Sequence, residues 1–364
     1  MLTIHSKKIF LWLSAVLCSI SFQDPEFGIS LDCARRFYTV SEIKRYIDLL
    51  SLQPNSFLQL HLTDNENVAI ESATLRQRAE DAELLDDGSY LNPHTGGRFL
   101  SKAQIAELLT YARTKRVRIV PEINMPAHAG GFLRLASLFL DKDIFQAIVA
   151  DDIETGELDL SSSESRRFAL QIYAEYADLF RDCRYFHIGC DELFLAAEED
   201  IRTYLSDIIG FLQKKGFIVR MWNDLITREN IPHIPTGVEI SYWSYDGDGK
   251  DRKERRLRRR KRASVPDLQK ARFNVLLYNS YYLYYVPSPE NNNEEDLQTM
   301  EEDLRERWSL RSWDGEHGKA LINPSHIVGA CLSVWNEHSA GISNDTVYSQ
   351  VERLYNTMKT KRFE

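Results

Sequence analysis

The chain has few cysteines, and their spacing does not suit a metal or redox site. Its 364 residues contain five of them, Cys18, Cys33, Cys183, Cys190 and Cys331. None belongs to a Cys-x-x-Cys pair, which argues against a structural zinc site or a dithiol redox centre. Cys33, Cys190 and Cys331 fall in or beside apolar strand-like runs, where a free cysteine usually packs as a small buried side chain. We therefore predict no structural disulfide and no metal.

An apolar run long enough to cross a membrane is also lacking. The run from Ile9 to Cys18 is shorter than the roughly 20 residues that a membrane-spanning helix needs. Lys7-Lys8 precedes it and small residues follow it, which is typical of a secretory signal. We expect residues 1–22 to be a signal peptide, the protein to be secreted, and no stable membrane insertion once the signal is removed. The alternative is a buried first strand or helix.

The chain has no excess of basic residues and no phosphate-binding glycine motif. Its net charge of −9 and pI of about 5.6 argue against nucleic acid as the main partner, because phosphates require a basic surface. No GxGxxG or GxxxxGK[ST] motif follows an early strand, which excludes the usual nucleotide-binding folds. With 43% hydrophobic residues, the chain can fill one large α/β barrel or two ordinary domains.

Short apolar runs alternate with helix-like segments along the chain. Capping boxes at Thr39 with Glu42 and at Ser101 with Gln104 begin two helices, which are predicted to end near residues 52 and 115. Eight alternations predict an α/β fold, a single (β/α)8 barrel over residues 29–364, with a doubly wound open sheet as the alternative. Strands are predicted at 29–33, 57–62, 117–123, 185–189, 217–222, 238–243, 273–278 and 327–335, and further helices at 162–180, 196–215 and 345–359.

Acidic and aromatic side chains gather at the predicted carboxyl ends of these strands, where barrel enzymes hold their sites. Carboxylates accept hydrogen bonds from sugar hydroxyls, and aromatic rings stack on the C–H faces of a sugar. The sequence therefore predicts a carbohydrate site. The residues are Asp32, Arg35, Asp64, Glu122, Asn124, His128, Asp191, Glu192, Trp222, Asp224, Trp243, Asp246, 281–285, Trp335 and Glu337.

The segment from His187 to Glu192 is the most informative, because it places two adjacent carboxylates behind an apolar run. Two ionised carboxylates in a sheltered place repel each other and lose hydration. One of them is expected to have a raised pKa or a dedicated partner. General acid catalysis requires such a group.

Several segments resemble family 20 of the glycoside hydrolases, the β-N-acetylhexosaminidases. The resemblance runs from Ile29 to the C-terminus, and the second half looks like the single-domain members that degrade a biofilm matrix. The segments are Leu31–Tyr38, Leu60–Asp64, Pro121–His128, His187–Glu192, Met221–Asp224, Tyr242–Asp248, Tyr278–Tyr284 and Leu332–Trp335.

This resemblance implies retaining hydrolysis assisted by the substrate's own 2-acetamido group, with no metal or cofactor. The partner would be an N-acetylglucosamine-containing glycan, above all β-1,6-linked poly-N-acetylglucosamine of biofilm. Glu192 matches the general acid/base, and Asp191 matches the residue that orients the acetamido group and stabilises an oxazolinium ion. Tyr284 matches the tyrosine that holds the acetamido oxygen, and Asp64 with His128 matches a relay to Glu192. The matched substrate-binding residues are Arg35, Trp222, Trp243, Asp251, Trp335 and Glu337.

Some positions depart from the family pattern. Asn124 stands where aspartate is usual, and Asn336 replaces a glycine. Cys190 replaces the glycine before the acid pair, which is costly if φ is positive there. Two alternatives therefore stay open: an exo-hexosaminidase acting on chitobiose or glycoconjugates, and a glycan-binding protein on an inactive barrel.

The chain also contains one stretch of concentrated positive charge. Residues 250–262 are densely basic. A solvated helix face or loop is the favoured interpretation, and attachment to an anionic cell surface or matrix polymer is the alternative.

Overall fold

The computed structural model describes residues 24–247, 249, 251–290, 294–316, 318 and 320–362. The predicted signal peptide, residues 1–22, lies outside the described residues. Within the described part, no helix has both the length and the apolar character needed to span a bilayer.

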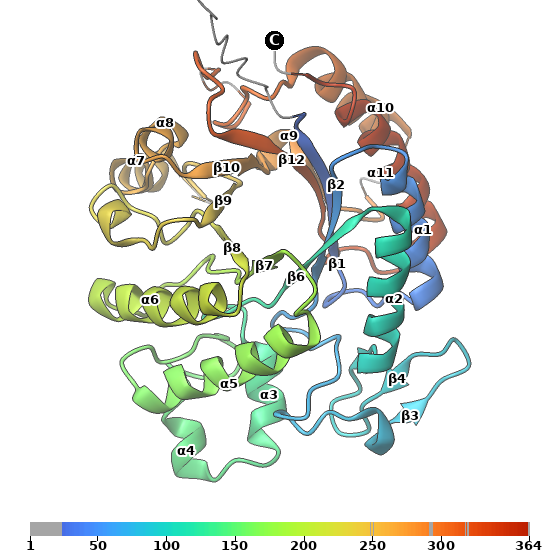
Figure 1. Ribbon diagram of the computed structural model, residues 1–364, viewed down its shortest axis with the longest axis vertical. Helices are drawn as coiled ribbons and strands as arrows, with labels where there is room; N and C mark the ends of the chain where they lie inside the picture. Colours follow the sequence, from blue (N-terminus) through green and yellow to red (C-terminus); the bar gives the residue numbers. More distant parts are fainter. Residues whose placement is uncertain are drawn as a thin grey trace, which may run out of the picture.

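Eight parallel strands form a closed ring with helices around its outside (Figure 1). The first strand of the ring pairs with both the second and the last, which closes the barrel. The predicted (β/α)8 barrel is thereby confirmed. In ring order the strands are β1 (Glu26–Asp32), β2 (Ser56–His61), β6 (Arg118–Glu122), β7 (Tyr185–His187), β8 (Ile218–Trp222), β9 (Glu239–Tyr242), β10 (Asn274–Leu277) and β12 (Ile327–Val334).

The long helices begin where their sequence signals place them. Thr39 accepts a hydrogen bond from the backbone N–H of Glu42, whose carboxylate accepts from the N–H of Thr39, and Ser101 with Gln104 repeats this arrangement. These capping boxes satisfy N–H groups that the first turn leaves unpaired. The helices are α1 (Val40–Ser51), α2 (Lys102–Lys115), α3 (Gly130–Ser137), α4 (Lys142–Gln146), α5 (Ser163–Leu179), α6 (Glu198–Lys214), α7 (Arg252–Lys261), α8 (Val265–Lys270), α9 (Ser280–Leu283), α10 (Glu294–Glu302) and α11 (Asn344–Met358).

Some short elements have no sequence prediction. A small antiparallel sheet inserted between β2 and α2 contains β3 (Glu83–Leu84), β4 (Tyr90–Leu91) and β5 (Arg98–Phe99). The two-residue β11 (Tyr284–Tyr285) pairs with β12. Two residues are too few to display the alternation by which a strand is recognised.

The barrel interior holds polar as well as apolar side chains. Gln59 and His61 alternate with apolar neighbours on β2, and Glu122 and His187 stand at the ends of β6 and β7; all four are buried. Successive residues of a strand face opposite sides, so the inward positions of adjacent strands meet below the carboxyl-end face. This polar layer lies under the candidate site.

The four described cysteines are free. Cys33, Cys190 and Cys331 are buried and Cys183 is half-buried. Burial raises the pKa of each thiol, which disfavours the reactive thiolate.

Candidate active site

A cavity of about 150 Å³ opens at the carboxyl ends of the barrel strands. It brings together nine of the eleven catalytic and substrate-binding residues that the family resemblance implies, together with His61. Drug-sized ligands usually occupy pockets of about 300 Å³ or more, so this cavity suits a single small unit such as one sugar ring. Its lining residues are Arg35, His61, Asp64, His128, Asp191, Glu192, Trp243, Tyr284, Trp335 and Glu337.

Trp222 and Asp251 do not line the cavity. Trp222 is 1% exposed and lies one layer deeper, where its Nε1 donates a 2.8 Å hydrogen bond to Glu122. Asp251 precedes α7, and its carboxylate accepts the backbone N–H groups of Lys253 at 2.7 Å and Glu254 at 2.9 Å. The structure thus gives Trp222 a supporting contact below the cavity and gives Asp251 a helix-capping contact.

The chain makes an unusual turn at the acid pair. Gly189, Cys190 and Glu192 have φ values of +70°, +71° and +49°. L-residues rarely adopt this left-handed conformation, and non-glycine outliers of this kind concentrate at functional sites. Cys190 therefore has the positive φ that makes a side chain costly there. Its buried Sγ lies 3.3 Å from the carbonyl oxygen of Met125.

Substitutions at Cys190 are expected to separate backbone strain from packing. Cys190→Val should lower the free energy of unfolding by about 2–3 kcal/mol, because a β-branched side chain fits a positive φ poorly. Cys190→Gly should change it by less than about 1 kcal/mol, because relief of strain offsets the lost thiol packing and the added chain entropy. Urea unfolding of both variants measures this difference. Equal destabilisation by valine and glycine would mean that packing, not φ, limits this position.

Asn124 holds Asp191 in place. Its amide Nδ2 donates to Asp191 Oδ1 at 2.9 Å, while its Oδ1 accepts the backbone N–H of Cys190 at 3.2 Å. The backbone N–H of Asn124 itself is fixed by Thr63 Oγ1 at 2.9 Å. A hydrogen bond donated to a carboxylate favours its anionic form. The departure from the usual aspartate thus places a donor, instead of a second carboxylate, beside Asp191.

His128 connects Asp64 to the acid pair. Its Nδ1 lies 3.0 Å from Asp64 Oδ1, and its Nε2 lies 3.4 Å from Glu192 Oε2 and 3.7 Å from Asp191 Oδ2. Burial lowers the pKa of His128, but Asp64 and Asp191 together hold that pKa well above its usual value. The protonated ring therefore presents a positive charge to both acids.

Burial has the opposite effect on Asp191. It raises the pKa of this carboxyl to about 6, against the opposing effect of His128, and the carboxylates of Asp224 and Glu122 raise it further. Asp191 is mostly ionised at pH 7 and mostly protonated at pH 5. Asp191 is thus the acid of the pair with the raised pKa that the sequence predicts for one of them.

The pKa of Asp191 leads to a pH prediction. If the anion of Asp191 is required, kcat/KM should fall about tenfold per pH unit below pH 6, since protonation removes the competent form. Asn124→Asp should move this acid limb to higher pH, because a second carboxylate raises the pKa of the first. A pH–rate profile of both proteins on an aryl N-acetyl-β-glucosaminide checks this. An unchanged limb in Asn124→Asp would assign the titration to another group.

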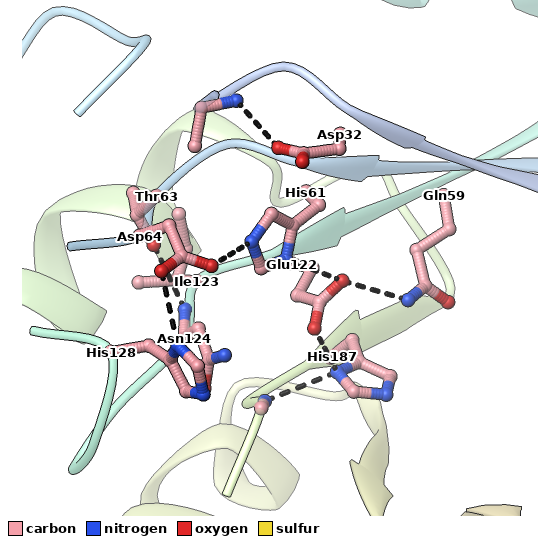
Figure 2. A network of polar contacts seen from close by, with 12 residues as sticks. Asp32, Gln59, His61, Thr63, Asp64, Glu122, Ile123, Asn124, His128 and His187 are labelled. Atoms are coloured by element: carbon pink, nitrogen blue, oxygen red, sulfur yellow. Dashed lines mark hydrogen bonds and ion pairs between the residues drawn. The ribbon is translucent and has the colours of Figure 1, made fainter. Parts of the chain in front are cut away.

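A chain of buried polar groups continues below the cavity (Figure 2). His61 Nε2 lies 2.8 Å from Asp64 Oδ2, and its Nδ1 lies 3.1 Å from Glu122 Oε2. Burial lowers the pKa of His61, but Glu122 and Asp64 raise it to about 10. Burial favours neutral Glu122, yet His187 and His61 bring its pKa down to about 2. Glu122 also accepts from Gln59 at 2.8 Å, so it joins several strands of the barrel.

Loss of the Glu122 charge is expected to destabilise the fold. Glu122→Gln removes a counter-charge from buried His61, and breaking a buried ion pair on one side typically costs about 3–5 kcal/mol. The surface variant Glu164→Gln, which loses an exposed pair with Arg167, should cost less than about 1 kcal/mol. Urea unfolding at pH 7 compares the two. Equal stabilities would mean that this network does not hold the barrel together.

Another part of the cavity lining suits sugar hydroxyls. The guanidinium of Arg35 is fixed by Asp64 at 2.7 Å, Asp32 at 3.2 Å and Glu66 at 3.3 Å. It lies 5.8 Å from the ring centre of Trp335. A rigid guanidinium and a nearby carboxylate, that of Glu337, provide a donor and an acceptor at the cavity wall.

Aromatic rings form the remaining wall. Trp243 and Tyr284 are nearly parallel, with ring centres 6.1 Å apart and planes at 11°. Trp243 Nε1 donates to Asp224 at 2.5 Å, and Asp224 also pairs with Arg262. Asp224 therefore supports the wall from behind. Burial raises the pKa of Tyr284 well above its usual value, so its hydroxyl keeps its proton and can donate.

Two residues of this centre carry no catalytic or binding role in the family resemblance, although Glu122 is among the strand-end residues of the predicted carbohydrate site. His61 reaches the cavity from the end of β2, and Glu122 lies directly beneath it. The signal for both was a charged or titratable residue at an inward position of a predicted strand, where a buried polar group needs a partner.

A closed (β/α)8 barrel with an adjacent acid pair and an aromatic-walled cavity at the strand ends defines a glycoside-hydrolase type of protein. The chain belongs to glycosyl hydrolase family 20, because residues 27–351 match the catalytic domain of that family. The crystal structure of dispersin B has 36% identical residues and a TM-score of 0.88, over 93% of this chain and 99% of that chain.

Other relatives match over part of their length. A probable β-hexosaminidase of Arthroderma benhamiae is 27% identical over 252 residues, covering 60% of this chain and 39% of that protein. Beta-hexosaminidase 1 of Coccidioides posadasii is 29% identical over 250 residues, covering 60% and 40%. The chain thus spans about two fifths of the length of these curated relatives. The pneumococcal exo-β-D-N-acetylglucosaminidase StrH, at 19% identity and a TM-score of 0.70 over 92% and 82%, shares the fold.

Proposed function

We propose that this protein hydrolyses β-linked N-acetylglucosamine in a glycan, with retention of configuration and with the substrate's acetamido group as the nucleophile. One observation carries the proposal. Asp191 is held by Asn124 and faces the protonated ring of His128, beside Glu192, in a cavity that also contains Tyr284. A fixed anion next to a proton donor suits a reaction in which positive charge develops near the sugar.

The first step breaks the glycosidic bond. Glu192 gives its proton to the glycosidic oxygen while the acetamido oxygen of the same sugar attacks C1. The C1–O bond to the leaving group breaks, an alcohol departs, and a cyclic oxazolinium ion remains. The Asp191 anion accepts a hydrogen bond from the acetamido N–H and opposes the positive charge. The Tyr284 hydroxyl donates to the acetamido oxygen and aligns it for attack.

The second step restores the enzyme. Water attacks C1 from the face that the leaving group vacated, and Glu192, now a carboxylate, takes its proton. The C1–oxygen bond of the oxazolinium ring breaks and the acetamido group is released unchanged. Two attacks on C1 give net retention. His128 helps Glu192 alternate between its two states because its charge, fixed by Asp64, lies 3.4 Å from the Glu192 carboxyl.

The substrate we propose is β-1,6-linked poly-N-acetylglucosamine of a biofilm matrix. Likeness to dispersin B over nearly all of both chains supports this choice. A secreted protein would meet such a polymer, and we propose export through residues 1–22. Cell fractionation with an antibody to the barrel tests this, and retention of the protein inside the cell would contradict it.

Product analysis on defined oligomers decides the linkage. Equal amounts of β-1,6- and β-1,4-linked N-acetylglucosamine oligomers are digested side by side and resolved by mass and chromatography. We expect faster cleavage of the β-1,6 series. Faster cleavage of the β-1,4 series would favour an exo-hexosaminidase acting on chitobiose or glycoconjugates. The similarity to β-hexosaminidases supports this alternative. Binding without cleavage of either series would favour an inactive glycan-binding barrel.

A further inference from the structure

Helix α7 concentrates positive charge on an acidic protein. Eight of its ten side chains, from Arg252 to Lys261, are cationic and one is acidic, whereas the whole chain has a net charge of −9. The helix lies outside the barrel beside α8 and follows β9 in the chain (Figure 1). The proposed hydrolysis uses none of these cations.

One part of this charge is internal and holds the helix in place. Arg259 pairs with Asp246 at 2.9 Å and Asp314 at 2.7 Å. Arg258 pairs with Glu254 at 2.7 Å, one turn earlier on the same helix. A cation from outside the helix, Arg228, donates to the carbonyl oxygens of residues 259 and 260 and so caps the last turn. The contacts of Arg259 and Arg228 join α7 to other parts of the chain and fix its orientation on the barrel.

Five of the other six cations face solvent as a continuous arc. At about 100° per residue, half the circumference of α7 carries five cations and Leu257. Leu257 is 50% exposed, and among the described residues the ion pairs of α7 are made by Arg258 and Arg259, not by the five cations. The five are Arg252, Lys253, Arg256, Arg260 and Lys261.

The like charges of this arc destabilise the helix that carries them. Arg252 with Arg256, and Arg256 with Arg260, place like charges four residues apart, and like charges at this spacing weaken a helix. A solvated face that only needs solubility can alternate acids and bases and avoid this repulsion. An anionic partner laid along the arc would relieve it.

We propose that the outer arc of α7 binds an acidic polysaccharide, a linear glycan that carries carboxylate groups. The surface supplies many guanidinium groups, which bind carboxylates in a planar, two-pronged geometry. It offers no aromatic ring, so it has no platform for stacking nucleic-acid bases and no aromatic anchor for a membrane interface. The acidic remainder of the molecule disfavours a rigid or flat polyanion, such as a nucleic-acid duplex or a membrane surface, whereas a flexible chain can follow one helix about 15 Å long.

The arc is also joined to the wall of the cavity. Arg262 directly follows α7 and pairs with Asp224, which accepts from the indole of Trp243. Two contacts therefore separate the end of the basic helix from the aromatic wall. A matrix polymer held on α7 would keep the cavity close to glycan chains of the same matrix.

The test is binding of polygalacturonate to the full chain. The triple variant Arg252→Gln, Arg256→Gln and Arg260→Gln removes the centre of the arc. The control Lys142→Gln, Arg181→Gln and Lys214→Gln removes the same charge from exposed cations on other elements. At about 50 mM salt we expect the arc variant to bind about tenfold more weakly than the parent protein and the control to bind within about twofold of it. Thermal unfolding confirms that all three proteins are folded.

Several outcomes would overturn the proposal. One is that the parent protein does not bind polygalacturonate. Another is that both triple variants lose the same amount of affinity for it. Tighter binding to duplex DNA or to phosphatidylglycerol vesicles than to polygalacturonate would assign the arc to another class of partner. Because binding is measured without turnover, the result does not depend on the proposed hydrolysis.

Discussion

Glu192→Gln is expected to lower kcat on β-linked N-acetylglucosamine substrates by about 10²–10⁴-fold. Glutamine keeps the shape of the side chain but has no proton to give to the departing oxygen. The carboxyl of Glu192 lies 3.4 Å from His128 and at the cavity surface, where it can reach a glycosidic oxygen. KM should change little, because the sugar is held by other residues of the cavity.

The choice of leaving group makes this prediction sharper. A nitrophenolate leaves without protonation, whereas a sugar alcohol needs the proton. Glu192→Gln should therefore lose more activity on an oligosaccharide than on a nitrophenyl substrate in steady-state kinetics. An equal loss on both, or full activity on the oligosaccharide, would contradict the assignment of Glu192 as the acid.

Asp191→Asn is expected to lower kcat by about 10²–10³-fold, because a neutral amide cannot oppose the charge of the oxazolinium ion. The substitution preserves local structure, because the amide oxygen of the new side chain can still accept a hydrogen bond from Asn124. In the parent protein Asn124 Nδ2 lies 2.9 Å from Asp191 Oδ1. The charge of Asp191, and little else, is removed.

Two measurements separate this effect from simple loss of binding. Steady-state kinetics gives kcat, and titration with N-acetylglucosamine gives the affinity for the neutral product, which should stay within a few fold of the parent value. A weakened product affinity with an unchanged kcat would show that Asp191 acts in ground-state binding instead of in stabilising the intermediate.

The barrel could be predicted from the sequence because its strands are buried and bounded by clear signals. The predicted run 217–222 and the observed Ile218–Trp222 differ by one residue, and the capping boxes at Thr39 and Ser101 place two helices to within a residue. Burial of both faces gives parallel strands a nearly continuous apolar character, which is visible without coordinates.

The inserted sheet β3–β4–β5 could not be predicted, because three two-residue strands depend on contacts with one another and not on a local pattern. The candidate site shows a similar division. A parallel barrel brings the strand ends to one face, so residues such as Arg35 and Glu337 could be expected to meet across the whole chain length. How deeply each side chain lies in the barrel could not be predicted. Trp222 and Trp335 both stand at the carboxyl end of a predicted strand, yet only Trp335 reaches the cavity.

The left-handed turn at the acid pair also had no direct sequence signal. Gly189 permits a positive φ, but Cys190 and Glu192 do not favour it. The conformation is imposed by contacts with other strands, above all the hydrogen bond from the Cys190 N–H to Asn124. The acid pair thus lies on a backbone geometry that the local sequence opposes.

The anomeric form of the first product tests the central claim most directly. Proton NMR during hydrolysis of an aryl N-acetyl-β-glucosaminide, with the matching aryl β-glucoside as a control, reports both the stereochemistry and the need for the acetamido group. The account predicts that the β-anomer of N-acetylglucosamine appears first and that the glucoside, which lacks the internal nucleophile, is not measurably cleaved. Initial release of the α-anomer, or comparable cleavage of the glucoside, would contradict it.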